Sequence, residues 1–355
     1  MTAQRPSPAA FSVGGLPLGD PDLAAAVDRG LEAVESLLRR EVHSDYRFVA
    51  DTSLHLIEAG GKRFRPLLTL LAAQLAAGDE AQRSPTPHPD VPDDVVIAAT
   101  SVELVHLATL YHDDVMDEAT MRRGAQSANA RWDNTVAILT GDYLFAHASR
   151  LVSELGPEAV RIIAETFAEL VTGQMRETRG PRDEDPVAHY LAVVAEKTGS
   201  LIATSGRFGA MFAGAPPEQV EALRRFGEII GTAFQVADDI IDIASVSGDS
   251  GKTPGTDLRE GVATLPVLYA LADPGPTADR LRALGVGGGE GGQELDDAAV
   301  DEALDLLRSS QGLVRAREAL DAQAEAGRAE LRALPAGPAA DALGALLDYT
   351  IDRVG

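Results

Sequence analysis

The chain contains no cysteine, which excludes a disulfide framework, a thiol nucleophile and a zinc site built on cysteine. Positive charge is also scarce. Its 31 lysines and arginines are outnumbered by 55 aspartates and glutamates, and a formal net charge of −24 argues against general affinity for nucleic acid or anionic lipid. The N-terminus lacks a basic segment followed by an apolar one, and no uninterrupted apolar run reaches membrane-spanning length. We therefore expect a soluble, cytoplasmic protein that binds no nucleic acid and does not insert stably into a membrane.

Aromatic residues make up only 5% of the 355 residues, whereas alanine and leucine recur at helical spacing, so the sequence predicts an all-α protein. Residues 1–19 are expected to form a flexible tail and 20–355 one helical domain, because no long linker divides them. Prolines near 78–93 and glycines near 285–295 predict loops. The predicted helices cover residues 21–40, 46–59, a segment after Pro66 to about 77, 94–118, 126–132, 134–154, 157–178, 186–213, 217–244, 261–272, 296–309, 312–333 and 337–353.

Two acidic groups of the same spacing end apolar helical segments. The first consists of Asp113, Asp114 and Asp117, and the second of Asp238, Asp239 and Asp242. On a helix, positions i and i+4 lie on one face, about 6 Å apart along the axis. Like charges so placed destabilise a helix by only about 0.2–0.5 kcal/mol per pair, which an exposed face tolerates. A solvated acidic surface therefore remains an alternative for either group taken alone.

The apolar neighbours of both groups favour a bound cation. Leu107 and Leu110 precede the first group, and Phe234 and Val236 precede the second, so both groups lie at the ends of helices that are expected to be buried. Carboxylates gathered at the mouth of an apolar bundle repel one another unless a cation lies between them. Hard oxygen ligands without cysteine favour Mg²⁺, which is usually shared between carboxylates and a substrate phosphate.

Basic residues cluster near the acidic groups and suggest an anionic ligand. Lys62, Arg63 and Arg65 follow two glycines, and guanidinium groups on such a loop suit phosphate. The further basic positions are Arg122, Arg123, Lys197 and Lys252. An ordinary solvated loop is the alternative for 62–65, and a surface lysine is the alternative for Lys197. His106, two turns before Asp113, suits a core position equally well, and packing is the expected role of His112.

Taken together, these segments resemble the trans-isoprenyl diphosphate synthases, the polyprenyl synthetase family. The resemblance rests on Gly-Gly-Lys-Arg-Phe-Arg-Pro at 60–66, the two aspartate groups, Arg-Arg-Gly at 122–124 and Lys-Thr at 197–198, and it covers roughly residues 20–350. It implies a single-domain bundle of mostly antiparallel helices around a deep apolar cavity, in a homodimer. It also implies a prenyltransferase that adds isopentenyl diphosphate to an allylic diphosphate primer, farnesyl or geranylgeranyl diphosphate.

The same resemblance assigns roles to individual residues. It implies that three Mg²⁺ ions per active site are held by Asp113, Asp117, Asp238 and Asp242. Asp114, Asp239 and Lys197 complete the implied catalytic set. Isopentenyl diphosphate would be bound by Lys62, Arg65, His106 and Arg123. The allylic diphosphate would be bound by Arg122, Lys197, Thr198, Gln235 and Lys252.

Product length is expected to depend on the residues below the first aspartate group. By resemblance, Ala108 and Thr109 line the floor of the cavity, and short-chain members have aromatic residues there. Helical geometry supports this position for Thr109, which lies one turn below Asp113, whereas the role of Ala108 rests on the resemblance alone. The small side chains predict a product longer than geranylgeranyl, and Ala108→Phe is expected to shorten it. The chain departs from the family at Val262, where many members have a lysine, so that position receives no diphosphate role.

Two other functions remain as alternatives. A terpene cyclase also uses an acidic group of this spacing, but it binds one diphosphate and does not need a second basic loop. A non-catalytic or partner-dependent subunit of a heteromeric synthase is expected to have lost aspartates, and this chain retains both groups complete.

Overall fold

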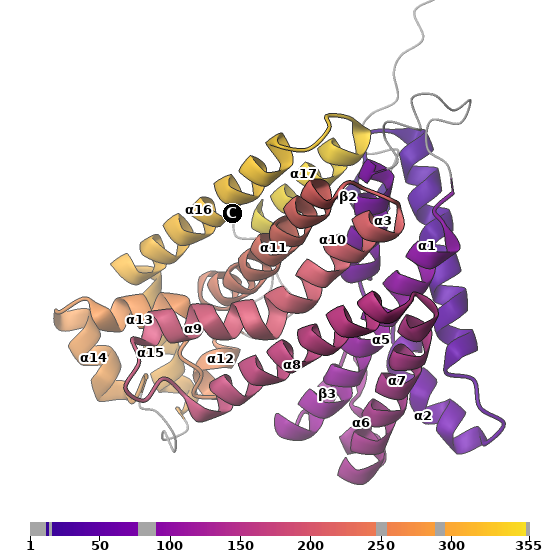
Figure 1. Cartoon of the computed structure of the whole chain (residues 1–355). Coiled ribbons are helices and arrows are strands. Elements are labelled where there is room, and N and C mark those ends of the chain that lie inside the picture. The colour runs from indigo at the N-terminus through magenta and orange to yellow at the C-terminus, as the bar shows by residue number, and fades with distance from the viewer. Residues whose placement is uncertain (1–11, 14–15, 77–89, 246–253, 288–294, 353–355) are drawn as a thin grey trace, which may run out of the picture. The chain divides into compact units, whose positions relative to one another are not determined.

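The computed structural model describes residues 12–13, 16–76, 90–245, 254–287 and 295–352, and these are almost entirely helical (Figure 1). The helices are α1 (Pro21–Glu41), α2 (Arg47–Glu58), α3 (Phe64–Ala76), α5 (Asp93–Met116), α6 (Ala128–Arg131), α7 (Asn134–Glu154), α8 (Pro157–Arg179), α9 (Pro186–Val194), α10 (Ser200–Phe212), α11 (Pro217–Ala244), α12 (Thr256–Arg259), α13 (Leu265–Ala272), α14 (Pro276–Leu284), α15 (Asp297–Arg308), α16 (Gln311–Arg332) and α17 (Pro338–Ile351). A π-helix, η2 (Ala195–Gly199), joins α9 to α10. The predicted all-α class is confirmed.

Two short antiparallel hairpins complete the described secondary structure. The first pairs β1 (Ser12–Val13) with β2 (Leu16–Pro17), and the second pairs β3 (Met121–Arg122) with β4 (Ala125–Gln126). The sequence predicts neither hairpin. Leu16 and Leu18 are buried, so the segment predicted to be a flexible tail, 1–19, packs against the protein at these two residues. Most of the two loops predicted near 78–93 and 285–295 lies outside the described residues, because 77–89 and 288–294 are not described.

The chain divides into two compact units. The first is formed by the described parts of Met1–Ala168, Leu201–Gly227 and Glu330–Ala345, and the second by Glu169–Ser200, Glu228–Ala329 and Leu346–Gly355. The expectation of a single domain stays a prediction.

Helix α5 is the central helix of the first unit and packs against α1, α3 and α7. Its Leu104 and Leu107 are fully buried, and the hydroxyl of Tyr111 donates to the carbonyl oxygen of Thr52. By length and composition α5 resembles a membrane span, but 67% of its apolar window is buried inside the protein. It is therefore the core helix of this unit.

The second unit has its apolar core around the C-terminal part of α11. Ile240 and Ile243 are fully buried there, together with Leu265 of α13 and Val300 of α15. The guanidinium group of Arg308 donates to the carbonyl oxygens of Ile243 at 3.0 Å and Ser245 at 2.8 Å. These bonds satisfy carbonyl groups that the end of α11 leaves without helical partners.

Candidate active site

The first aspartate group lies at the C-terminal end of α5. The helix ends at Met116, and the N–H group of Asp117 donates to the carbonyl oxygen of Asp113 at 2.8 Å. Asp114 has no exposed surface, and its Oδ1 accepts a hydrogen bond from Nε of Arg122 at 2.6 Å. Its Oδ2 is buried and has no hydrogen-bond partner among the described residues. Asp117 is largely exposed, with Oδ2 at 3.7 Å from Arg122. Within this group, Asp114 is therefore the anchored carboxylate and Asp117 the accessible one.

Burial raises the pKa of the Asp114 carboxyl, and the hydrogen bond from Arg122 opposes this shift. The net effect is a raised pKa, so Arg122 compensates only part of the cost of the buried charge. The uncompensated carboxylate oxygen is the chemical feature that a nearby cation would satisfy.

Arg122 and Arg123 are presented by the β3–β4 hairpin. The two residues between the paired strands, Arg123 and Gly124, have φ values of 55° and 77°. Two central residues with positive φ are typical of the tight two-residue turns that match the twist of an antiparallel hairpin. Arg123 is a non-glycine residue in a left-handed conformation, which is uncommon and costs about 1–2 kcal/mol. The turn directs its guanidinium group to the carbonyl oxygens of Leu56, at 3.2 Å, and Gly60.

The three basic residues at the start of α3, Lys62, Arg63 and Arg65, differ in their surroundings. Lys62 is exposed, which suits contact with a diphosphate. Arg63 is buried instead, donating to Glu35, to Glu103 at 3.0 Å and to the carbonyl oxygen of Ile57 at 3.0 Å. The interpretation of Arg63 as a phosphate ligand is therefore wrong, because its guanidinium group is occupied by the protein itself.

Arg65 and His106 lie beside this buried pair and have limited access to solvent. Burial lowers the pKa of Arg65 to about 10, so it remains charged at neutral pH. Its Nε is buried and has no hydrogen-bond partner among the described residues. Burial, followed by the charges of Arg65 and Arg123, holds the pKa of His106 well below its usual value. His106 is therefore neutral at physiological pH, with one ring N–H able to donate to an anion.

The His106 shift predicts a pH dependence of stability. Because the pKa of this base is lower in the folded than in the unfolded protein, the unfolded protein binds more protons below about pH 6.5. The stability is thus fully present above pH 6.5 and falls as the pH drops towards the folded pKa, by up to about 1.4 kcal/mol per pH unit. Thermal unfolding between pH 7.5 and 5 is expected to show a steeper loss for the wild type than for His106→Gln. An equal loss of stability with falling pH in the wild type and in His106→Gln would contradict this prediction.

His112 lies over Gly141 of α7, as expected for a packing residue. Its Nε2 is 3.2 Å from the carbonyl oxygen of Ile138 and 3.4 Å from Oδ1 of Asp142. A Cβ atom at Gly141 would lie only 2.4 Å from the imidazole of His112 and 3.1 Å from the carbonyl oxygen of Ala108. The absence of a side chain at Gly141 therefore allows α7 to approach α5 next to the acidic group.

The second aspartate group lies near the end of α11, in the second unit. Asp239 is buried and accepts hydrogen bonds from the hydroxyl of Tyr190 and from Nε2 of Gln235 at 3.1 Å. Burial raises the pKa of Asp239 to about 8, although both hydrogen bonds oppose that shift. Asp242 accepts from the N–H groups of Thr256 at 3.1 Å and Asp257 at 3.2 Å, and so holds the start of α12. Asp238 is half-buried.

Lys197 and Thr198 lie on η2, the five-residue π-helix at Ala195–Gly199. A π-helix contains one more residue per hydrogen-bonded turn than an α-helix, which changes the direction of the side chains. Short π-helical turns are often found at functional sites. Lys197 forms an ion pair with Glu177 of α8. A Cβ atom at Gly173 would lie 2.6 Å from the backbone nitrogen of Lys197, so α8 approaches η2 closely at a glycine.

Among the described residues, no three histidine or carboxylate side chains converge closely enough to bind a metal ion by themselves. The donor chemistry nevertheless fits Mg²⁺. Each group has one buried aspartate whose pKa is raised, Asp114 and Asp239, beside more accessible carboxylates with hard oxygen atoms. Mg²⁺ retains waters and takes phosphate oxygens as ligands, so a complete protein cage is not required.

One predicted site residue cannot be placed. Lys252 falls in 246–253, outside the described residues. Val262 is exposed, in agreement with its having no assigned role. Conversely, Glu103, Glu35 and Tyr190 support the site residues directly and were not predicted. Only Glu103 has a sequence signal, because it is a lone charge within the apolar run of α5.

Comparisons with known proteins place these features in a family. Residues 47–298 match the family model described as polyprenyl synthetase. The chain is 57% identical over 344 residues to the nonaprenyl diphosphate synthase of Mycobacterium tuberculosis, covering 97% of this chain and 98% of the relative. The chain belongs to the polyprenyl synthetase family. The predicted family and the predicted enzyme class, a prenyltransferase, are confirmed.

Solved structures of family members agree with this assignment. The geranylgeranyl pyrophosphate synthase of Corynebacterium glutamicum, complexed with calcium and isoprenyl diphosphate, has a TM-score of 0.82 and 49% identity, and the match covers 95% of this chain and 99% of that chain. The decaprenyl diphosphate synthase of Rhodobacter capsulatus has a TM-score of 0.79 and 34% identity, and covers 94% of this chain and 98% of its own. The all-α isoprenoid synthase fold is therefore confirmed.

Proposed function

We propose that this polyprenyl synthetase condenses isopentenyl diphosphate head to tail onto an allylic diphosphate primer, farnesyl or geranylgeranyl diphosphate, and makes a long-chain all-trans polyprenyl diphosphate. One observation carries the proposal. Helix α5 carries Asp113 and Asp114 at its C-terminal end, directly before Asp117, and it also carries Glu103, which Arg63 and Arg123 approach from other segments. An acidic group suits a metal-bound diphosphate and a cationic cluster suits a metal-free one, so the arrangement fits two diphosphate substrates.

The binding roles follow from these two environments. Lys62, Arg65, His106 and Arg123 would bind isopentenyl diphosphate, and Arg122, Lys197, Thr198, Gln235 and Lys252 the allylic diphosphate. Asp113, Asp117, Asp238 and Asp242 would hold Mg²⁺, three ions per active site. Calcium in the C. glutamicum structure supports dependence on a divalent cation. Arg122 and Lys197 are paired with Asp114 and Glu177 in this structure, so binding of the allylic diphosphate would have to draw them from those carboxylates.

The proposed reaction needs these groups because charge develops on the leaving diphosphate. The allylic C–O bond breaks, the double bond of isopentenyl diphosphate attacks the resulting cation, and a proton is lost to the departing diphosphate. Mg²⁺, when bound, would stabilise that leaving group. Arg122 and Lys197 would add positive charge to the same oxygens as the bond breaks. Because the departing diphosphate takes the proton, no protein base is assigned. An apolar pocket would keep water from the cation.

A product longer than geranylgeranyl is supported by the small residues below the first group and by the nonaprenyl diphosphate synthase relative. Ala108 is fully buried where α5 meets α7, whereas Thr109 is half-buried, with its hydroxyl donating to the carbonyl oxygen of His106 at 2.8 Å. A phenylalanine at Ala108 would therefore overpack the core, at a cost of about 1–3 kcal/mol.

Thr109→Phe is expected to shorten the product by several isoprene units with less loss of stability than Ala108→Phe. An aromatic ring one turn below Asp113 would occupy the path of the growing chain. Chromatography of the dephosphorylated products checks this, with Thr109→Val as the control for loss of the hydroxyl. An unchanged product length in a folded Thr109→Phe variant would show that another residue sets the limit.

A homodimer and a cytoplasmic location are also part of the proposal. On α7, Ile138 and Leu139 are 43% and 61% exposed, and such large apolar side chains favour burial against a second copy. The burial of α5 supports a water-soluble enzyme.

Release of pyrophosphate distinguishes the proposed synthase from the two alternatives. With Mg²⁺ and farnesyl diphosphate, the synthase is expected to release pyrophosphate only when isopentenyl diphosphate is added. A terpene cyclase would release it from the allylic substrate alone. A partner-dependent subunit would release none until a second protein is supplied, and either of these results would overturn the proposal.

A further inference from the structure

Three arginines surround one buried carboxylate in the first unit. Glu103, on α5, is 1% exposed, and its Oε1 lies 3.0 Å from Nη1 of Arg63 and 3.9 Å from Nη2 of Arg123. Its charge also acts on Arg65, whose pKa it raises against the larger effect of burial. Two of these arginines, Arg65 and Arg123, are residues to which we assign the diphosphate of isopentenyl diphosphate, whereas Glu103 and Arg63 do not face a substrate in that assignment.

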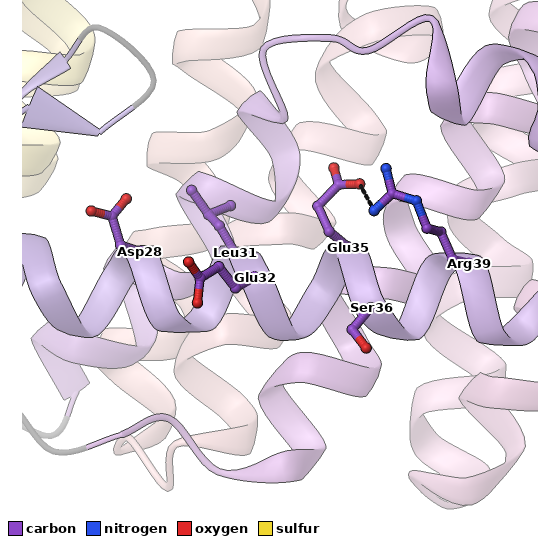
Figure 2. A pocket seen from close by; sticks show the side chains of 6 residues that line it. All are labelled: Asp28, Leu31, Glu32, Glu35, Ser36 and Arg39. Atoms are coloured by element: carbon purple, nitrogen blue, oxygen red, sulfur yellow. Dashed lines mark ion pairs between the residues drawn. The ribbon is translucent and has the colours of Figure 1, made fainter.

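Glu35, on α1, is the second carboxylate of the cluster. It forms an ion pair with Arg63 and lies 3.5 Å from Arg39, at the edge of a groove along α1 (Figure 2). Its side chain is 28% exposed, compared with 2% for Glu103. Because solvent screens Glu35 more, Glu103 is the main counter-ion inside the cluster.

The charges do not balance within the cluster. Arg63, Arg65 and Arg123 carry three positive charges, and the two glutamates carry two negative ones. Burial lowers the pKa of both Arg65 and Arg123, and Nε of Arg65 is buried without a hydrogen-bond partner among the described residues. One positive charge and a free donor therefore remain for an anion.

The same ion pairs fix the backbone of the loop. Arg63 has φ of 47°, a left-handed conformation that is strained for a residue with a side chain. Its hydrogen bonds to Glu103, Glu35 and the carbonyl oxygen of Ile57 hold this conformation. Gly61 lies against the guanidinium group of Arg123, where a Cβ atom would be only 2.8 Å away. Glu103 is thus connected through Arg63 to the loop that bears Lys62 and to the start of α3, which bears Arg65.

We infer that Glu103 is a positioning residue for the isopentenyl diphosphate site. Its carboxylate holds Arg63 inside the protein and keeps the like-charged Arg65 and Arg123 close together, so that they meet the diphosphate without rearrangement. This inference rests on the proposed function. Replacing Glu103 would leave the residues that contact substrate intact but would release the loop and increase repulsion among the arginines.

The test is a comparison of Michaelis constants in Glu103→Gln. We expect the KM for isopentenyl diphosphate to rise at least tenfold, with the KM for the allylic primer and kcat changed less than threefold. Glu103→Asp, which retains the charge, is expected to recover part of the affinity. Glu330→Gln is the matched control, because Glu330 pairs with Arg225 at 2.8 Å in the same unit, and neither KM should change.

A direct binding measurement separates this inference from the proposed function. Titration calorimetry with isopentenyl diphosphate in EDTA is expected to show at least tenfold weaker binding to Glu103→Gln than to the wild type. Equal binding by a folded Glu103→Gln would overturn the inference and leave a purely structural role. If that variant does not fold, Glu103→Asp replaces it. Because the shorter side chain is expected to recover only part of the affinity, binding equal to that of the wild type would again overturn the inference. Tight binding of isopentenyl diphosphate without chain elongation by the wild type would instead overturn the proposed function alone.

Discussion

Replacement of Asp113 and Asp117 together by asparagine is expected to lower kcat at least about 1,000-fold. Both carboxylates lie at the end of α5, Asp117 is largely exposed, and a neutral amide is a weak ligand for Mg²⁺. Removal of stabilisation from the charge that develops on a leaving group typically costs two to three orders of magnitude per interaction. The measurement is the initial rate of isopentenyl diphosphate incorporation at saturating substrate and Mg²⁺.

The opposite end of the same helix supplies a control for this first prediction. Asp93 and Asp94 lie in the first turn of α5 and are exposed. Asp93→Asn with Asp94→Asn removes the same two charges and is expected to leave kcat within about threefold, since exposed charges at a helix N-terminus contribute under about 1 kcal/mol each to stability. Activity within tenfold of the wild type in Asp113→Asn/Asp117→Asn would exclude these aspartates as metal ligands.

Gly173→Ala is expected to raise the KM for the allylic primer about 10- to 100-fold while the KM for isopentenyl diphosphate stays unchanged. The added Cβ atom would lie 2.6 Å from the backbone nitrogen of Lys197 and 2.8 Å from Cβ of Glu196. Backbone atoms cannot yield as the end of a flexible side chain can, so η2 must shift or lose its π-helical turn. Displacement of a binding group by about 1 Å is enough to cost up to 100-fold.

Gly199→Ala is the matched control, because Gly199 lies in η2 together with Lys197. The nearest atom to a Cβ at Gly199 is the carbonyl oxygen of Glu228 at 3.4 Å, a contact that a small adjustment relieves. Its KM values are expected to remain within about threefold of the wild type. If Gly173→Ala and Gly199→Ala changed the KM values for both substrates equally, the π-helix would not position Lys197.

Long amphipathic helices with clear ends were predicted from the sequence to the residue. The bounds of α7 and α11 agree with the predicted 134–154 and 217–244. The start of α7 is marked by Asp133, whose carboxylate accepts from the N–H of Val136 at 2.8 Å, and that of α11 by a proline pair. Asp20 caps α1 in the same way.

Short elements and local irregularities were not predicted. Helix α14 is a short helix of mixed polarity, Pro276–Leu284, in which apolar residues recur too few times to show a period. The predicted helix at 186–213 is interrupted by η2, because a sequence with helical spacing fits an α-helix with or without a π-helical turn. The β3–β4 hairpin depends on the left-handed turn at Arg123 and Gly124, and arginine gives no sequence signal for that conformation.

Some of the functional residues could be predicted from the sequence and others could not. Spacing alone predicted both aspartate groups, because the helical period places residues i and i+4 on one face of a helix. It did not distinguish Arg63 from Lys62 and Arg65, since the direction of each side chain in a loop depends on its partners. Arg63 is drawn inward by Glu35 and Glu103, which come from α1 and α5, and such long-range pairs leave no local pattern in the sequence.

The length of the product made by the purified chain shows whether this protein alone is a long-chain polyprenyl diphosphate synthase. Labelled isopentenyl diphosphate is incubated with this protein alone, Mg²⁺ and geranylgeranyl diphosphate, and the dephosphorylated products are separated by chain length. We expect labelled all-trans polyprenyl alcohols longer than geranylgeraniol, and none after chelation of Mg²⁺. An absence of label in any product extended beyond the primer would contradict this expectation.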